Sequence, residues 1–212
     1  MTETVAVVGG TGDLGLGLAA RLAGSYRVLI GSREEGRAAE AAARASSLSG
    51  SSVEGRTNDD AAAVADIIVL AIPDLPSDQM LLSLKPRVAG KLVISPIVPM
   101  DFRDGLFVSR ASEASAAEKV SSVVETRVAA AFHQVPAARL LEVGQPLDYD
   151  VLVAADTREI YAEAARLVSK VSRLRPLHAG PLRCSRTLEM LTPTLLNVGK
   201  LNRIKNPSIR VV

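Results

Sequence analysis

Short runs of consecutive apolar residues recur along the first two thirds of the chain and alternate with longer segments of helical character. The run IIVLAI at residues 67–72 is typical, because its apolar residues are continuous and do not alternate with polar ones. Such runs indicate strands covered on both faces, and their alternation with helices predicts a parallel sheet between two helical layers. The pattern predicts strands at 5–8, 27–30, 52–56, 66–72, 91–95 and 127–132, helices at 16–23, 34–45, 58–65, 79–84 and 115–125, and a flexible serine-rich loop at 46–52.

A glycine-rich segment, GGTGDLG at residues 9–15, follows the first apolar run directly and precedes the first predicted helix. A strand that enters such a turn and opens a helix is typical of a dinucleotide-phosphate site. Gly10 permits the tight turn, Gly12 lets backbone N–H groups approach a pyrophosphate, and Gly15 lets the helix lie close to the strand. The N-terminus of the helix supplies partial positive charge. The segment therefore predicts a Rossmann-type, doubly wound α/β fold.

The pattern changes after about Gly144. It predicts a strand at 150–155, an amphipathic helix at 158–172, a short strand at 175–179 and a last helix at 185–201. A chain of 212 residues can bury one sizeable core and a small appendage, but it has no room for a large separate substrate domain. We therefore expect a Rossmann domain at residues 1–144 and a small α/β C-terminal subdomain at residues 145–212.

The end of the second predicted strand indicates which dinucleotide is bound. An NAD-preferring site usually carries an acid there for the ribose hydroxyls, whereas this chain has Ser32 and Arg33. A hydroxyl and a guanidinium suit a 2′-phosphate, and Arg37 lies one helical turn further on, so the sequence predicts NADP. Two alternatives stay open: Ser32 as an ordinary helix N-cap, and Glu34 or Glu35 as the ribose acid of an NAD site.

Composition narrows the class of protein. With 25 Lys and Arg against 23 Asp and Glu, the net charge of +2 argues against nucleic acid or an anionic membrane as the main partner. Cys184 is the single cysteine, which excludes an intrachain disulfide and a cysteine-based metal cluster and favours a reducing cytoplasm. We expect no signal peptide, because an apolar strand is predicted almost at once, and the sequence has no apolar run of about 20 residues, the length that spans a bilayer. We expect a cytoplasmic protein.

Proline-rich loops follow several predicted strands, at the sheet edge where ligands of parallel sheets collect. Prolines stiffen these loops, and their apolar neighbours form dry walls suited to a flat ring. Hydride transfer needs two planar rings held in contact with water kept out. The loops lie at residues 72–73, 95–99 and 133–139, and a fourth at 180–182 precedes the last helix.

Several segments of the chain together resemble the NADPH:coenzyme F420 oxidoreductases, or deazaflavin reductases, of archaea and some bacteria. The resemblance covers nearly the whole chain, and SPIVP, H-x-x-PAAR and GPL-x-x-SR are much more specific than the glycine motif. It implies hydride exchange, carbon to carbon and without a metal, between NADP(H) and the 8-hydroxy-5-deazaflavin ring. The segments are VAVVGGTGDLGLGLA, VLIGSR, VLAIP, VISPIVP, HQVPAAR, RPLHAGPL and SRTLEMLTPTLLN.

The resemblance also implies roles for individual residues. The C-terminal subdomain would help to form the deazaflavin site, and His133, if it is functional, would hydrogen-bond a polar edge of that ring and steady the charge that moves there. His133, Arg186 and Thr192 would lie on the deazaflavin side. The cofactor-binding residues would be Gly10, Thr11, Gly12, Asp13 and Leu14 in the phosphate turn, Ser32, Arg33 and Arg37 at the 2′-phosphate, and Ile72, Pro73, Val98 and Ala137 beside the nicotinamide.

The chain departs from the family after residues 72–73, where it carries Asp74-Leu75-Pro76 in place of a large aromatic side chain. This keeps open a related NADPH-dependent reductase of another acceptor, such as a flavin, a ferric chelate or a small imine. A non-catalytic NADP-binding sensor is the alternative from a different class.

Some candidate residues have structural alternatives. A lone histidine at a strand end, such as His133, is often structural, and Arg186 and Glu189 have the spacing of an intrahelical ion pair. Cys184 has no basic neighbour in sequence and favours a packing role. The basic residues of the C-terminal stretch either meet an anionic cofactor tail or are solvated surface. These are Lys200, Arg203, Lys205 and Arg210.

A homodimer is a further expectation, because the last predicted helix is rich in leucine and calls for a covering surface. The leucines concerned are Leu188, Leu191, Leu195 and Leu196.

Overall fold

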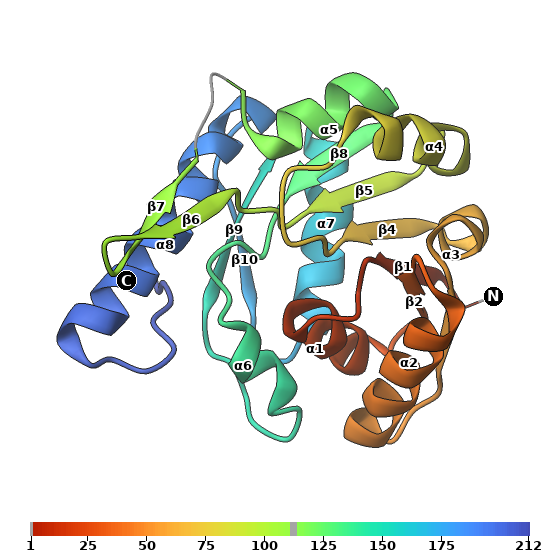
Figure 1. Ribbon diagram of the computed structural model, residues 1–212, viewed down its shortest axis with the longest axis horizontal. Coiled ribbons are helices and arrows are strands. Elements are labelled where there is room, and N and C mark those ends of the chain that lie inside the picture. The colour runs from red at the N-terminus through yellow and green to blue at the C-terminus, as the bar shows by residue number, and fades with distance from the viewer. Residues whose placement is uncertain (1, 111–113) are drawn as a thin grey trace.

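The computed structural model describes residues 2–110 and 114–212, and its centre is an eight-stranded sheet (Figure 1). The strand order is β10-β9-β8-β5-β4-β1-β2-β3. All neighbouring strands pair in parallel except β8 and β9, which pair antiparallel. The strands are β1 (Thr4–Val8), β2 (Arg27–Ser32), β3 (Val53–Thr57), β4 (Ile67–Leu70), β5 (Leu92–Ser95), β8 (Arg127–Ala130), β9 (Asp150–Ala155) and β10 (Arg175–His178).

Helices cover both faces of the sheet, as the sequence predicts. Helices α1, α2 and α7 share one hydrophobic core with the sheet, and α3, α4 and α5 share the other. Residues of β1 alternate between these cores: Val5 and Val7 belong to the first, Ala6 and Val8 to the second. This explains why the strands read as continuous apolar runs. The helices are α1 (Asp13–Leu22), α2 (Glu35–Ser49), α3 (Asn58–Val64), α4 (Asp78–Val88), α5 (Ala116–Val124), α6 (Ala137–Leu141), α7 (Arg158–Lys170) and α8 (Ser185–Asn202).

The serine-rich tract at 46–52 is not the flexible loop that its composition predicts, because α2 continues through it to Ser49. Ser46 Oγ donates to the carbonyl of Ala42 at 2.8 Å, and Ser49 Oγ donates to that of Ala45 at 2.9 Å. These hydroxyls bond back to the helix and are satisfied within it. Gly50 ends α2 with a φ of 69°, a left-handed conformation that glycine adopts without strain.

The pattern analysis missed a hairpin of two short strands, β6 (Met100–Arg103) and β7 (Leu106–Ser109). Its turn is Asp104-Gly105, with φ values of 49° and 80°, the conformation that the Asp-Gly pair favours. The hairpin packs on α8, where the Asn197 side chain donates to the Phe107 carbonyl and accepts from the Phe107 N–H, both at 2.8 Å. Figure 1 shows the hairpin and α8 forming a lobe on the opposite side of the sheet from α2.

The residues after β8 join the same sheet, with β9 and β10 running opposite to the other strands. A 3-10 turn, η1 (Leu182–Cys184), leads into α8. Within the described residues, no helix is both long and apolar enough to cross a membrane.

Candidate active site

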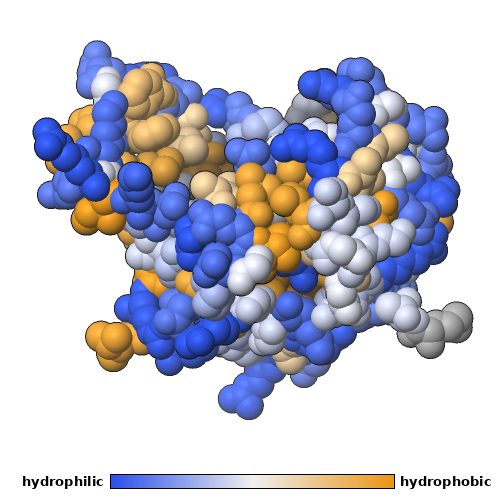
Figure 2. Space-filling model, turned by 90° about the horizontal axis from the view of Figure 1, so that it is seen from below, coloured by the Kyte–Doolittle hydropathy of each residue, from blue (hydrophilic) through white to orange (hydrophobic). Residues whose placement is uncertain are grey.

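A cleft of about 540 Å³ opens at the carboxyl edge of the sheet, where the loops after β4, β5 and β8 meet α1 and α8. This is the edge at which ligands of doubly wound sheets bind. Figure 2 shows hydrophobic surface gathered in the middle of the molecule's lower face. The lining is largely apolar, which favours planar rings over charged groups. It includes Leu14, Ile72, Pro73, Val98, His133, Ala137 and Thr192 among the residues singled out from the sequence.

The glycine-rich turn closes as its sequence requires. A Cβ atom on Gly15 would lie 2.4 Å from Gly10 Cα, so these two backbones touch. Gly10 N–H lies within hydrogen-bonding distance of the carbonyls of Val7 and Gly31, at 3.2 and 3.1 Å. Gly12 is the N-cap of α1, and a Cβ atom there would meet nothing within 4 Å. The open side of the turn therefore leaves room for a phosphate beside the first N–H groups of α1.

Asn58 supports the glycine-rich turn, a contact that sequence analysis missed because the two segments lie 49 positions apart. Its Oδ1 accepts from Gly9 N–H at 3.1 Å. Gly9 has a φ of 71°, and a Cβ atom on it would lie 2.6 Å from Ile72 Cγ2. The turn is thus bonded to α3 through Asn58 and packs closely against Ile72, which lines the cleft.

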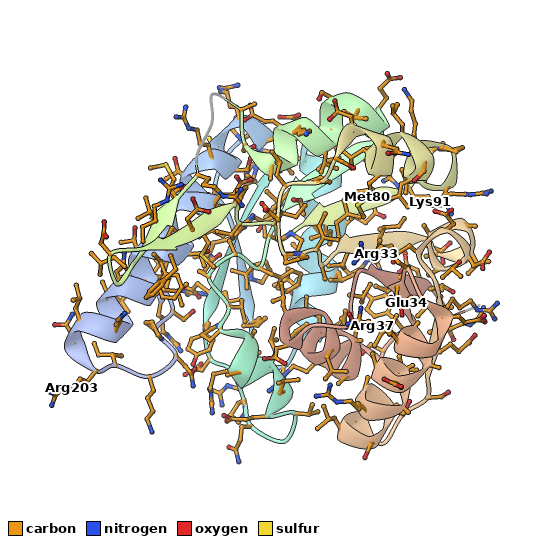
Figure 3. All side chains as sticks on the ribbon, viewed as in Figure 1. Arg33, Glu34, Arg37, Met80, Lys91 and Arg203 are labelled. Atoms are coloured by element: carbon orange, nitrogen blue, oxygen red, sulfur yellow. The ribbon has the colours of Figure 1, made fainter. Side chains whose placement is uncertain are left out.

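The basic residues predicted for a 2′-phosphate lie after β2, away from the apolar cleft lining. Arg33 and Arg37 are exposed and lie near each other beside α1 and the start of α2 (Figure 3). Arg37 pairs with Glu34 at 3.6 Å, an exposed pair that costs little to exchange for an anion. Ser32 is not the N-cap of α2, because that helix begins at Glu35 and its N-cap is Glu34. Ser32 Oγ instead accepts from Glu34 N–H at 3.3 Å.

His133 lines the cleft but is only 4% exposed. Neither of its ring nitrogens has a hydrogen-bond partner among the described residues. Burial lowers the pKa of His133 to about 3, so the imidazole is neutral at physiological pH. Phe132, directly before it, is buried with a φ of 71°, a conformation that strains a bulky residue. The chain thus carries local backbone strain directly before His133, at the wall of the cleft.

Helix α8 forms the wall of the cleft opposite the turn. Thr192 Oγ1 donates to the His133 carbonyl at 2.6 Å and joins the two walls. Leu195 and Leu196 line the cleft, and Leu188 is buried in the core. Of the four leucines on which the dimer expectation rests, Leu188 is buried, and Leu191, Leu195 and Leu196 are half-buried.

Glu189 and Arg186 do not form the intrahelical ion pair that their spacing suggests. Glu189 is buried and accepts from the N–H groups of Ala116 and Ala117, at 3.0 and 3.2 Å, at the N-terminus of α5. Burial raises the pKa of Glu189 to about 7 despite these two bonds. Arg186 is exposed at the start of α8 and does not line the cleft.

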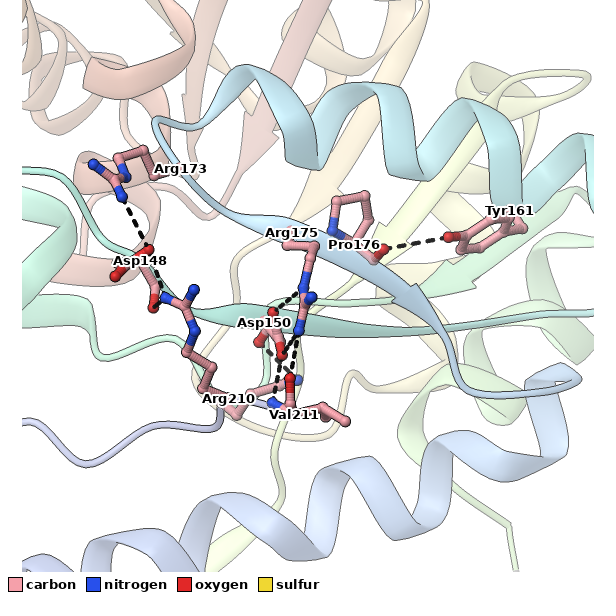
Figure 4. A network of polar contacts seen from close by, with 9 residues as sticks. Asp148, Asp150, Tyr161, Arg173, Arg175, Pro176, Arg210 and Val211 are labelled. Atoms are coloured by element: carbon pink, nitrogen blue, oxygen red, sulfur yellow. Dashed lines mark hydrogen bonds and ion pairs between the residues drawn. The ribbon is translucent and has the colours of Figure 1, made fainter.

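The basic C-terminal residues have different surroundings. Lys200 lines the cleft, donates to the Gly105 carbonyl at 2.5 Å and lies 4.4 Å from the ring centroid of Phe102. Arg210 pairs with Asp148 at 2.6 Å beside β9 (Figure 4) and is therefore not simply solvated. Arg203, exposed at the C-cap of α8, points outward (Figure 3), and Lys205 is also exposed.

The last residues of the chain fold back on β9. Asp150 accepts from Arg175 at 2.7 and 2.8 Å and from the Val211 N–H at 2.6 Å, and the Ile209 carbonyl accepts from Asp150 N–H at 3.0 Å (Figure 4). This places the loop that follows α8 against the cleft, where Ile204 lies in the lining. Among the described residues, no group of three or more His, Cys, Asp or Glu side chains is arranged to hold a metal ion.

Comparison with known proteins adds to this geometry. Residues 4–99 match the family model described as NADP oxidoreductase, coenzyme F420-dependent. An F420-dependent NADP reductase of Methanothermobacter thermautotrophicus is 42% identical over 221 residues, covering 100% of this chain and 95% of the relative. Another from Methanocaldococcus jannaschii is 33% identical over 216 residues, covering 98% and 97%.

Solved structures share the fold. The crystal structure of a putative F420-dependent NADP-reductase from Arthrobacter sp. FB24 has a TM-score of 0.83 at 21% identity and covers 100% of both chains. A pyrroline-5-carboxylate reductase from Coxiella burnetii has a TM-score of 0.56 at 14% identity, covering 84% of this chain and 59% of the other. These structures therefore share the α/β fold of this chain, with its mostly parallel sheet between helices.

Proposed function

The chain belongs to the family of F420-dependent NADP oxidoreductases, and on this premise we propose that it transfers a hydride between NADP(H) and the 8-hydroxy-5-deazaflavin ring of coenzyme F420. The observation that carries the proposal is a single apolar cleft that begins at Leu14, on the first turn of α1, and ends at α8, with the buried His133 on its wall. Two bound rings supply the chemistry, which is the exchange of a hydride from carbon to carbon.

The nucleotide end of NADP is held, in this proposal, by the glycine-rich turn and the residues after β2. The N-terminus of α1 offers N–H groups and partial positive charge to the pyrophosphate, with Thr11, Gly12, Asp13 and Leu14 around it. Ser32, Arg33 and Arg37 bind the 2′-phosphate, which NAD lacks. Gly10 keeps its role in the tight turn.

The nicotinamide ring lies against the apolar walls made by the loops after β4 and β5 and by α6. These walls contain Ile72, Pro73, Val98 and Ala137, all of which line the cleft. Side chains without donors or acceptors exclude water from the two reacting carbons and set the distance between the rings. The main contribution of the protein to the reaction is therefore positioning.

The deazaflavin ring occupies the side of the cleft between His133 and α8, where the 145–212 subdomain completes the site. A neutral imidazole can donate one hydrogen bond and accept another, and both ring nitrogens of His133 are buried without a partner among the described residues. In this proposal one of them bonds to a polar edge of the deazaflavin ring. Thr192 keeps the His133 backbone in place through its bond to the carbonyl. Arg186 is exposed at the start of α8 and outside the cleft lining, so in this proposal it would meet only a part of the substrate that extends beyond the cleft.

We also propose that the protein is a cytoplasmic homodimer. Its one cysteine, Cys184, is free, which suits a reducing compartment. The hairpin and α8 expose apolar side chains that a second copy would cover: Phe102 is 57% exposed, Val108 45% and Leu201 69%. Sedimentation across a range of protein concentrations tests the dimer, and a monomer at every concentration would exclude it.

The test of function is to mix the purified protein with reduced coenzyme F420 and NADP and to follow NADPH formation and deazaflavin oxidation by absorbance, and then to repeat the experiment with NAD. Turnover with a strong preference for NADP supports the proposal. Turnover only with a free flavin, a ferric chelate or a small imine would assign another acceptor. In that case Asp74, which follows the cleft residue Pro73 and pairs with Arg110, becomes the first residue to vary. Binding of NADP without turnover on any acceptor would indicate a sensor.

A further inference from the structure

Arg21 is a buried charged residue that the proposed chemistry does not use. It lies in the last turn of α1 and is 8% exposed. Its Nε donates to the carbonyl of Leu140 at 2.8 Å, and its Nη2 lies 2.9, 2.6 and 3.0 Å from the carbonyls of Arg139, Glu142 and Gln145. One guanidinium therefore gathers four backbone carbonyls from a segment about 120 positions away in the sequence.

These carbonyls belong to the end of α6 and the loop that follows it. The last carbonyls of a helix have no partner within the helix, and a positive charge beside them is favourable. The planar guanidinium has several donors in a fixed arrangement, which a lysine cannot reproduce. Arg21 thus acts as a C-terminal cap for α6 that is supplied by another helix.

A second contact between the same two helices is steric. Gly17, one turn before Arg21 on α1, lies so close to α6 that a Cβ atom on it would be 2.4 Å from Leu140 Cβ. Residues four apart lie on one face of a helix, so Gly17 and Arg21 form a single docking surface for α6. The close contact at Gly17 and the hydrogen bonds at Arg21 together determine the distance of α6 from α1 and its rotation relative to that helix.

The start of α6 belongs to the cleft. Pro136, Ala137 and Ala138 line it, and Leu14, at the opposite end of α1, lines it as well. One rigid helix therefore carries the phosphate turn at its N-terminus and holds a wall of the ring site near its C-terminus. We propose that Arg21 is a positioning residue, which sets the wall at Ala137 at the correct depth relative to the bound phosphates. The proposal rests on the proposed function.

The test separates the phosphate end of the cofactor from its ring. For wild type, Arg21→Lys and Arg21→Met, calorimetry gives the Kd for 2′,5′-ADP, which lacks the nicotinamide. Fluorescence gives the emission of bound NADPH, and absorbance gives kcat with reduced coenzyme F420 and NADP. We expect an unchanged Kd for 2′,5′-ADP and an NADPH emission shifted toward that of the free cofactor. We expect kcat to fall by about 10- to 100-fold, as displacement of a reacting ring does.

Two further variants complete the design. Gly17→Ala pushes α6 away without changing any charge and should reproduce the same pattern, so it decides the matter if Arg21→Met does not fold. Arg166→Met is the matched control, because Arg166 on α7 bonds to Glu3 and to Tyr26 and does not line the cleft. It should lose stability and keep both kcat and the NADPH emission.

Two results would overturn the inference. One is that kcat and NADPH emission in the Arg21 variants match those of Arg166→Met, which would leave Arg21 a merely structural role. The other is that the Kd for 2′,5′-ADP weakens in parallel with kcat, which would place the effect in the phosphate turn. If the wild-type protein shows no turnover with the deazaflavin, the proposed function fails, and the NADPH emission still decides the role of Arg21.

Discussion

Glu189→Gln should change how the stability of the protein depends on pH. In the folded protein, burial raises the pKa of Glu189 from 4.5 to about 7. Between these two values the folded chain holds a proton that the unfolded chain has released, so the free energy of unfolding falls as the pH rises. At about 1.4 kcal/mol per pH unit, the loss between pH 4.5 and pH 7 amounts to about 3 kcal/mol. The loss is complete above pH 7 and absent below pH 4.5.

Urea unfolding followed by far-ultraviolet circular dichroism, at intervals from pH 4.5 to pH 8, measures this difference. Glutamine cannot ionise, so the variant lacks this term, while every other titrating group is common to both proteins. One N–H of Ala116 or Ala117 loses its acceptor in the variant, a cost of about 1–3 kcal/mol that does not depend on pH. The free energy of unfolding of the wild type should therefore fall relative to that of the variant as the pH rises. Parallel curves for the two proteins would refute the reasoning.

Three other substitutions have defined outcomes. Arg33→Ala should raise KM for NADP by about 10- to 100-fold and leave KM for NAD nearly unchanged, because the lost charge-assisted bond is to the 2′-phosphate. Steady-state kinetics with both cofactors measure the two KM values, and equal increases would discredit the assignment. The free energy of unfolding of the wild type should fall as the pH drops below 6.5, because the unfolded chain takes up a proton at His133 that the buried ring, with a pKa of about 3, does not accept. His133→Asn should abolish this contribution. Acid unfolding of both proteins checks this, and the same dependence of stability on pH below 6.5 would argue against it. Gly15→Ala should weaken NADP binding severely, because the added Cβ would lie 2.4 Å from Gly10 Cα. Calorimetry measures the Kd for NADP, and a Kd equal to that of the wild type would show that the turn tolerates the displacement.

Much of the fold was predictable because its signals are local. The run at residues 5–8 and the glycines after it require a buried strand, a tight turn and a helix that starts against that strand, and each of these follows from neighbouring residues. The predicted bounds of some helices were close to the observed ones for the same reason. The helix predicted at 158–172, for example, is α7 at Arg158–Lys170. The prediction of a flexible loop at 46–52 was wrong. Serine-rich composition favours loops, but the hydroxyls of Ser46 and Ser49 bond to the preceding turn of the helix.

The hairpin between Met100 and Ser109 was missed although a local signal existed. The Asp104-Gly105 pair is typical of a two-residue turn, but the flanking strands are short and expose Phe102, so their pattern is weak. The antiparallel direction of β9 has no local signal, because strand pairing depends on the path that the chain takes between distant segments.

The amino-acid sequence by itself determined most strands and helices of the central sheet, the glycine-rich turn and the exposed basic pair at Arg33 and Arg37, because backbone conformation and short-range charge follow from adjacent residues. Only the tertiary structure decided which side chains meet across the cleft. Asn58 reaches Gly9, Arg21 reaches the end of α6, and Glu189 caps α5 rather than pairing within its own helix. Each of these contacts joins segments at least 49 positions apart, and only the folded chain brings such segments within bonding distance.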